Sequence, residues 1–201
     1  LQGTPVDYYF AVQEPITQTG LDHPMAVAYN TIGYDAQVLG NHEFNYGLPL
    51  LGAYIRDADF PVLAANVISV RTGRPAYRPY TLITRKVRGG PPVTIGVVGV
   101  TTPGSAIWDK ANVEGKLRFD DMVTSAAKWV PVVRARGADV VVVLSHGGIG
   151  GTSSYGGDLP PENPSDTIAQ KVPGIDVVVV GHTHRDVPEQ WVTNEVTGEQ
   201  V

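Results

Sequence analysis

Cysteine is absent from the 201 residues, which excludes disulfide bonds, thiolate metal ligands and a cysteine nucleophile. No segment approaches the roughly 20 consecutive apolar residues that a membrane-spanning helix needs. Basic residues are the minority, with 15 Lys and Arg against 20 Asp and Glu and a net charge of -5. Such a surface suits neither a nucleic-acid polymer nor an anionic membrane as partner. The lack of cysteine leaves the compartment open, because exported proteins need not carry disulfides.

Acidic residues are missing from one long stretch, between Phe60 and Trp108. The same stretch contains six basic residues: Arg71, Arg74, Arg78, Arg85, Lys86 and Arg88. The simpler interpretation is a solvated hairpin, since charge runs are weak signals of function. The alternative is a local positive field that attracts an anionic substrate.

The length and composition are those of one globular domain, with 42% hydrophobic residues. Apolar runs typical of strands alternate with segments typical of helices. The predicted helices are 22–33, with Asp22 as the cap, 48–56 and 119–137. The predicted strands are 36–39, 61–67, 80–87, 93–100, 140–144 and 177–180. The valine-rich runs 140–144 and 177–180 are expected to be buried on both faces. This alternation predicts an α/β or α+β layered fold.

Two further segments are irregular. Residues 151–164 are rich in Gly, Ser and Pro and predict a long loop, which is either a functional lid or a surface excursion. The final run from Trp191 to Val201 predicts a strand, a turn at Thr197-Gly198 and a second strand. Because that run stops in mid-pattern and the chain opens at Leu1, we expect both ends to lie inside a longer protein.

Four of the five histidines occur in three similar places, where an apolar strand runs into a short loop. These loops are Gly40-Asn41-His42-Glu43, Ser145-His146-Gly147 and Gly181-His182-Thr183-His184. Loops at the carboxyl ends of strands meet in one crevice, and imidazole and amide groups suit a transition-metal ion. Each motif alone could be a polar turn, but together they predict one shared metal site. His23 has no such context and is interpreted as structural.

These motifs resemble the last three metal-binding motifs of the calcineurin-like metallophosphoesterases. Within that family, residues 40–48, GNHEFNYGL, resemble the 5′-nucleotidase branch. Residues 64–68 and 107–112 are similar to bacterial 2′,3′-cyclic-nucleotide 2′-phosphodiesterases that double as 3′-nucleotidases. The resemblance covers essentially the whole chain and implies a four-layer αββα sandwich. It also implies that residues 1–201 are a catalytic-domain fragment without its first strands and without a C-terminal substrate-binding domain.

The resemblance further implies a site for two divalent metal ions, which could be Mn, Zn, Fe, Co or Mg. Asn41, His146 and His182 would bind one ion, and His184 the other. An Asp-x-His and a bridging Asp would lie upstream of Leu1, so the fragment alone should bind metal weakly and be a poor enzyme.

His42 is the catalytic candidate that is not a ligand. It would stabilise the transition state or protonate the leaving oxygen. Many 5′-nucleotidases have an Asp three residues later, which orients this imidazole, whereas this chain has Asn45. A strict His–Asp dyad is therefore in doubt, although Asn is typical of the cyclic-phosphodiesterase branch. Glu43 is interpreted as structural.

The function implied is hydrolysis of nucleotide phosphoesters, with 2′,3′-cyclic nucleotides and 3′-nucleotides as the leading substrates. A 5′-nucleotidase or nucleotide-sugar hydrolase is the enzymatic alternative, and a non-catalytic binding module with the same fold is the alternative of another class. By the same resemblance, the expected location is the periplasm, the cell wall or the medium.

Overall fold

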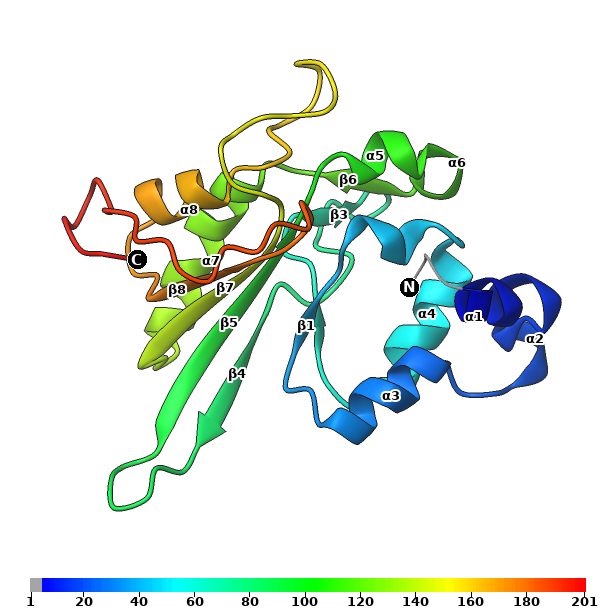
Figure 1. The fold of residues 1–201 in the computed structure, drawn as a ribbon, viewed down its shortest axis with the longest axis horizontal. Helices are drawn as coiled ribbons and strands as arrows, with labels where there is room; N and C mark the ends of the chain where they lie inside the picture. The colour runs from blue at the N-terminus through cyan, green and yellow to red at the C-terminus, as the bar shows by residue number, and fades with distance from the viewer. Residues whose placement is uncertain (1–4) are drawn as a thin grey trace.

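The computed structural model describes residues 5–201, and its main element is a four-stranded sheet in the order β4-β5-β7-β8 (Figure 1). The strands are β4 (Tyr80–Arg85), β5 (Val93–Thr101), β7 (Val140–His146) and β8 (Val177–Val180). β5, β7 and β8 are parallel, and β4 is antiparallel to β5. Thr101 pairs with His146 in this register, so β5 and β7 end at the same edge of the sheet.

Two smaller sheets complete the strand content of the described residues. β1 (Gln37–Val38) pairs in parallel with β2 (Val62–Leu63), and β3 (Val67–Ser69) is antiparallel to β6 (Leu117–Phe119). β1 contacts β5 and β7. The β1-β2 sheet therefore packs against the large sheet and leads into the segment that follows Val38.

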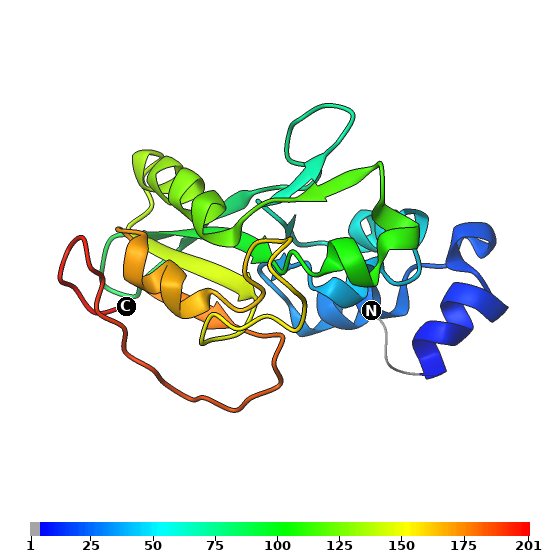
Figure 2. The same ribbon diagram turned by 90° about the horizontal axis from the view of Figure 1, so that it is seen from above.

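Helices cover the outer sides of the large sheet and of the β1-β2 sheet (Figures 1 and 2). α7 (Met122–Ala135) and α8 (Ser165–Lys171) lie on the large sheet, and α3 (Pro24–Ile32) and α4 (Leu48–Asp57) lie beyond β1. The short helices are α1 (Pro5–Tyr8), η1 (Tyr9–Gln13), α2 (Ile16–Thr19), η2 (Asn41–Phe44), α5 (Ser105–Trp108) and α6 (Lys110–Val113). The predicted α/β fold with helix, sheet, sheet and helix layers is confirmed.

Two large apolar clusters form most of the core, one on each side of the molecule, and a small third cluster contains Ile16, Leu50 and Ala53. The first packs α7 and α8 against the large sheet and includes Val98, Val130 and Val143. The second packs α3 and α4 around β1 and β2 and includes Leu39 and Phe44. The segment from Gly40 to Glu43 lies between two members of this second cluster, so packing fixes it at both ends.

Two predicted boundaries were wrong. α3 is capped by His23, whose Nδ1 accepts from the Met25 backbone N–H at 3.2 Å, rather than by Asp22. His23 is 3% exposed, in agreement with its structural interpretation. The predicted strand 61–67 divides into β2 and β3, because the Ala64 and Ala65 amides leave the β1-β2 ladder to bond Arg78 and Gly99.

The prediction that residues 177–180 are buried on both faces was also wrong. β8 is the edge strand of the large sheet, and Val177 and Val179 are 45% and 52% exposed. A run of valines indicates a strand, but it does not reveal whether another layer covers that strand.

The position of the basic residues between Phe60 and Trp108 favours the simpler interpretation, a solvated hairpin. Lys86 and Arg88 lie in the connection between β4 and β5, before β5 begins at Val93. His146 pairs with the opposite end of β5, at Thr101. The tip of the hairpin therefore points away from the site (Figure 1), and Arg85 pairs with Asp35.

The C-terminal run forms the predicted turn between two extended segments. The Val192 and Val201 backbones exchange hydrogen bonds of 3.0 and 2.9 Å, and Gly198 has a φ of +74°. Among residues 5–201, every helix is too short or too polar to cross a membrane.

Candidate metal centre

The first part of the site is the short helix η2, which begins where β1 ends. The Gly40 amide donates to Glu43 Oε2 at 2.5 Å, which supports the structural interpretation of Glu43. The adjacent Phe44 ring is fully buried against Phe119. Asn41, which starts the helix, is 9% exposed, so its side chain is directed by the fold rather than by solvent.

The structure brings Asn41 and His146 together from positions 105 residues apart. Asn41 Oδ1 lies 3.0 Å from His146 Nε2. A Cβ atom at Gly40 would lie 2.6 Å from His146 Cε1, so only glycine allows this approach without displacing the ring. The predicted meeting of the first and second motifs is therefore observed.

His182 joins them from the end of β8. Its ring centroid lies 5.2 Å from that of His146, and its Nε2 lies 2.9 Å from Glu162 Oε1. Glu162 is 6% exposed and comes from the long loop between β7 and α8. Because this carboxylate occupies Nε2, Nδ1 is the His182 nitrogen that could bind a metal ion.

His184 is the outlying member of the predicted set. His182 and His184 both have left-handed backbones, with φ of +83° and +53°, a conformation that is costly for residues other than glycine and concentrates at functional sites. Within residues 5–201, the hydrogen bonds and ring contacts that join Asn41, His146 and His182 do not extend to His184. In the same part of the chain, no three His, Asp or Glu side chains form a metal-binding group by themselves.

His42 lies beside this group and takes part in a different chain of contacts. Its Nδ1 lies 2.8 Å from Asn45 Oδ1, and Asn45 Nδ2 donates to Asp109 Oδ1 at 2.6 Å. Asp109 is 4% exposed, and its Oδ2 has no hydrogen-bond partner among the described residues. The two predicted catalytic residues are therefore in contact, with a buried carboxylate behind them.

Burial and neighbouring charge set the protonation of these groups. Burial lowers the pKa of His146 to about 4, with further lowering by His182, so its ring is neutral at pH 7 and available as a ligand. Burial acts to raise the pKa of Glu162, but bonds from Ser154 and His182 outweigh it and the pKa is lowered. Burial raises the pKa of Asp109, against the effects of Asn45 and His42.

The long loop 151–164 is attached to the site at its C-terminal end. Besides the Glu162 contact, Asn163 Oδ1 accepts from the Gly148 amide at 2.8 Å. The Tyr155 ring lies 6.0 Å from Trp108, which lies 5.7 Å from the His182 ring. The loop thus borders the centre, which favours the functional interpretation over a plain surface excursion.

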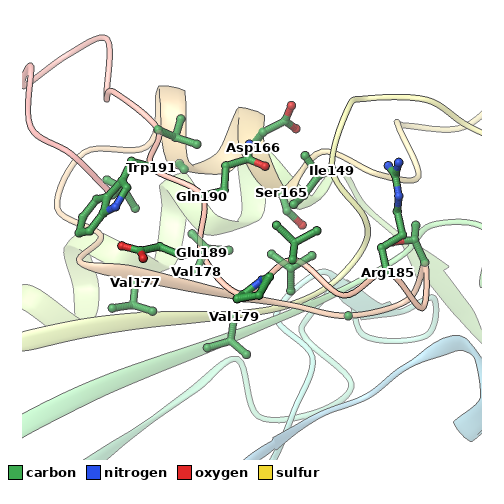
Figure 3. A pocket seen from close by; sticks show the side chains of 18 of the residues that line it. Ile149, Ser165, Asp166, Val177, Val178, Val179, Arg185, Glu189, Gln190 and Trp191 are labelled. Atoms are coloured by element: carbon green, nitrogen blue, oxygen red, sulfur yellow. The ribbon is translucent and has the colours of Figure 1, made fainter.

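An open groove of about 890 Å³ runs beside the centre, between β8, α8 and the segment 181–192 (Figure 3). Val177, Val179 and Trp191 give it an apolar wall, and Arg185 and Glu189 lie along its rim. His182 and His184 line it, whereas Asn41 and His146 do not. The groove therefore meets the candidate centre only along residues 182–184.

The donors fit a divalent transition metal. An amide oxygen and two imidazoles form the mixed oxygen and nitrogen set that Mn, Fe, Co and Zn accept. Glycine at position 40 provides the close approach, and Glu162 provides the carboxylate that commonly holds the second nitrogen of a metal-binding histidine.

Sequence reasoning missed Glu162 and Asp109. Glu162 lies in a loop whose length was a general signal of function, but no spacing rule connects it to His182, 20 residues later. Asp109 is 64 residues from Asn45. Its segment, 107–112, was notable only for its resemblance to the cyclic-phosphodiesterase branch.

Comparison with known proteins identifies the family. Residues 25–186 match the model of the calcineurin-like phosphoesterase family. The chain is 39% identical over 194 residues to a 2′,3′-cyclic-nucleotide 2′-phosphodiesterase/3′-nucleotidase of Yersinia enterocolitica, covering 94% of this chain and 29% of that protein. It is 32% identical to a 5′-nucleotidase of Rattus norvegicus, covering 77% of this chain and 24% of that protein.

A solved structure gives the same result in three dimensions. The calcineurin-like phosphoesterase YfkN from Bacillus subtilis superimposes with a TM-score of 0.82 at 37% identity, covering 94% of this chain and 57% of that one. The family match takes in all three histidine motifs, and the superposition extends over the layers that carry them. The chain therefore belongs to the calcineurin-like phosphoesterase family.

Proposed function

We propose that this chain is part of the catalytic domain of a metal-dependent hydrolase of nucleotide phosphoesters. The observation that carries the proposal is the convergence of Asn41 Oδ1 and His146 Nε2 at 3.0 Å, with His42 next to Asn41 in η2. Divalent ions bound by such a centre would activate a water molecule and offset the charge of the phosphoryl group.

The roles of the chain's own residues follow from their contacts. Asn41, His146 and His182 would hold one ion, with Glu162 orienting His182. The role of His184 at a second ion comes from the family resemblance and not from a contact. His42 contacts Asn45 through Nδ1, and its ring stabilises the transition state or delivers a proton to the leaving oxygen. The loop 151–164 borders the centre through Glu162 and Tyr155.

The leading substrates are 2′,3′-cyclic nucleotides and 3′-nucleotides. Greater likeness to the Yersinia enterocolitica enzyme, 39% against 32% for the rat 5′-nucleotidase, supports this choice, as does Asn45 in place of the Asp of many 5′-nucleotidases. Because the chain spans 29% of the length of that bacterial relative, a separate C-terminal domain that recognises the nucleoside is part of the proposal. An exported location is also part of the proposal, and it rests on the likeness to this family.

The test uses the full-length protein with Mn²⁺ and three substrates, 2′,3′-cyclic AMP, 3′-AMP and 5′-AMP. We expect turnover of the first two, at least tenfold reduced by His42→Ala. Turnover of 5′-AMP alone would reject the substrate assignment and leave a 5′-nucleotidase. Failure to hydrolyse any phosphoester, together with no heat of Mn²⁺ binding in calorimetry, would reject the enzyme and favour a binding module.

A further inference from the structure

The contact between Asn45 and Asp109 fixes the orientation of the Asn45 amide. A carboxylate oxygen can only accept a hydrogen bond, so the NH₂ group of Asn45 faces Asp109, at 2.6 Å. The amide oxygen then faces His42, 2.8 Å from Nδ1. Since that oxygen also only accepts, Nδ1 of His42 must carry the hydrogen.

The fold holds both ends of this chain of contacts. Asp109 lies at the junction of α5 and α6, where its amide donates to the Ser105 carbonyl at 3.1 Å. Three residues later, Asn112 Nδ2 donates to the carbonyls of Phe44 and Asn45, at 2.9 and 3.0 Å. The segment 109–112 is therefore attached to η2 through the Asn112 side chain as well as through the Asn45 side chain.

The burial and the hydrogen bonding of Asp109 distinguish it from an ordinary surface carboxylate. The side chain is 4% exposed, and Oδ2 has no hydrogen-bond partner among the described residues. Leaving a buried carboxylate oxygen without a partner costs stability, and such a cost often accompanies a functional role. The bond to Asn45 is the contact through which this carboxylate can act.

Resting on the function proposed above, we propose that Asp109 is a positioning residue that acts through Asn45 to fix the ring and the Nδ1–H tautomer of His42. Because Asp109 accepts from the NH₂ group of Asn45, the amide oxygen of Asn45 is held facing His42. The three side chains thus do what a direct His–Asp pair does: Nδ1–H stays bonded to Asn45, the protonated ring gives the proton on Nε2 to the leaving oxygen, and the neutral Nδ1–H tautomer remains.

The first test compares two leaving groups in the full-length protein with Mn²⁺. A nucleoside alkoxide leaves poorly and depends on His42, whereas 4-nitrophenolate from bis(4-nitrophenyl) phosphate leaves without a proton. In Asp109→Asn, the side chain at position 109 gains a hydrogen-bond donor, so the Asn45 amide can flip and turn its NH₂ group towards His42. We expect kcat for 2′,3′-cyclic AMP to fall about 10- to 100-fold with little change in KM, within the range for general acid catalysis. Turnover of the nitrophenyl ester should change less than about threefold.

The second test exchanges the two side chains. The double variant Asn45→Asp with Asp109→Asn keeps the charge and composition, and it places a carboxylate directly on Nδ1 of His42. We expect it to recover at least tenfold of the activity lost in Asp109→Asn. Asn112→Ala is the matched control, because it removes only bonds to the backbone carbonyls of Phe44 and Asn45 and keeps the three relay side chains. It should lower the turnover of both substrates equally.

Equal losses on both substrates in Asp109→Asn, or no recovery in the exchanged variant, would overturn the proposal. If Asp109→Asn fails to fold, the exchanged variant alone decides: activity near wild type supports the relay, and its loss rejects it. A wild-type protein that hydrolyses neither substrate would instead reject the proposed function.

Discussion

At the scale of single residues, the site combines ligands with the side chains that hold them. Glu162 is the clearest example, because it is buried and bonded to His182 at 2.9 Å. A carboxylate in this position fixes the tautomer of a metal-binding histidine and raises its basicity.

Glu162→Gln should therefore weaken Mn²⁺ binding by about 10- to 100-fold, as is typical for the loss of such a partner. Calorimetric titration of the full-length protein measures this directly. Glu189→Gln is the control, since it removes the same charge from an exposed part of the neighbouring segment. Equal affinity in both variants would contradict the role of Glu162.

His23 gives a second prediction at this scale, for stability against pH. Burial lowers its pKa to about 4, and Nδ1 accepts the capping bond from Met25, which requires an unprotonated nitrogen. The unfolded chain binds this proton near pH 6.5, so the stability from His23 is complete above pH 6.5 and is lost as the pH falls towards 4.

The expected loss is on the order of 2 kcal/mol between pH 7 and pH 4. Urea unfolding of the 201-residue chain at several pH values measures it. His23→Asn retains a capping acceptor but does not titrate, so its stability should fall less over the same window. Parallel curves for the two proteins would show that His23 contributes nothing to the pH dependence.

Residue contacts also explain which parts of the site could be predicted. Asn41 and His146 each follow an apolar strand, and the rule that such ends meet was sufficient to bring them together. Asp109 and Glu162 carry no local pattern, and their roles depend on how loops pack after the strands are placed. Both became visible only through side-chain contacts.

At the scale of elements, β5 is the strand on which the layers meet. A Cβ at Gly99 would lie 2.5 Å from Leu63 Cβ and 3.2 Å from the Leu63 backbone, where β5 crosses β2. The close contact of the two sheets therefore requires glycine at this position.

Gly99→Ala should destabilise the chain by about 1–3 kcal/mol through overpacking. Gly52→Ala in α4 is a matched control, because its added methyl group would meet nothing within 4 Å and alanine favours a helix by up to about 1 kcal/mol. Urea unfolding should move the two midpoints in opposite directions. A Gly99→Ala midpoint at or above wild type would contradict the argument.

The elements themselves were largely predictable, and the exceptions have physical causes. β7 and β8 were evident from their valines, but the exposure of β8 depends on its place at the edge of the sheet. The split between β2 and β3 depends on the Ala64 and Ala65 amides, which bond the Arg78 and Gly99 carbonyls, and the next residue, Asn66, bonds the Thr101 backbone through its buried amide. Neither feature leaves a periodic signal in the sequence.

At the scale of the whole molecule, the candidate centre lies between the two apolar clusters. Asn41 is flanked by Leu39 and Phe44 of one cluster, and His146 follows Val143 of the other. A metal ion held by both residues would join the two halves, and it would stabilise the folded state by mass action.

Mn²⁺ at about 100 times its dissociation constant should add about 2.7 kcal/mol to the stability of the full-length protein. Thermal unfolding with and without the ion measures this, and Asn41→Ala should reduce the increase. Ca²⁺ is the matched control, because nitrogen ligands suit it poorly. An equal increase with Ca²⁺ would contradict the assigned ligands.

The contact of Trp108 with His182 also provides an optical signal. The two rings lie 5.7 Å apart and are inclined by 30°, so the indole fluorescence should respond when the imidazole beside it gains a metal ion. Trp129 packs against the first core cluster, and Trp191 lines the groove without a ring contact to His182 among the described residues. Trp108→Phe should therefore abolish the change while most of the emission remains, and the native protein would report its own metal loading without an added dye.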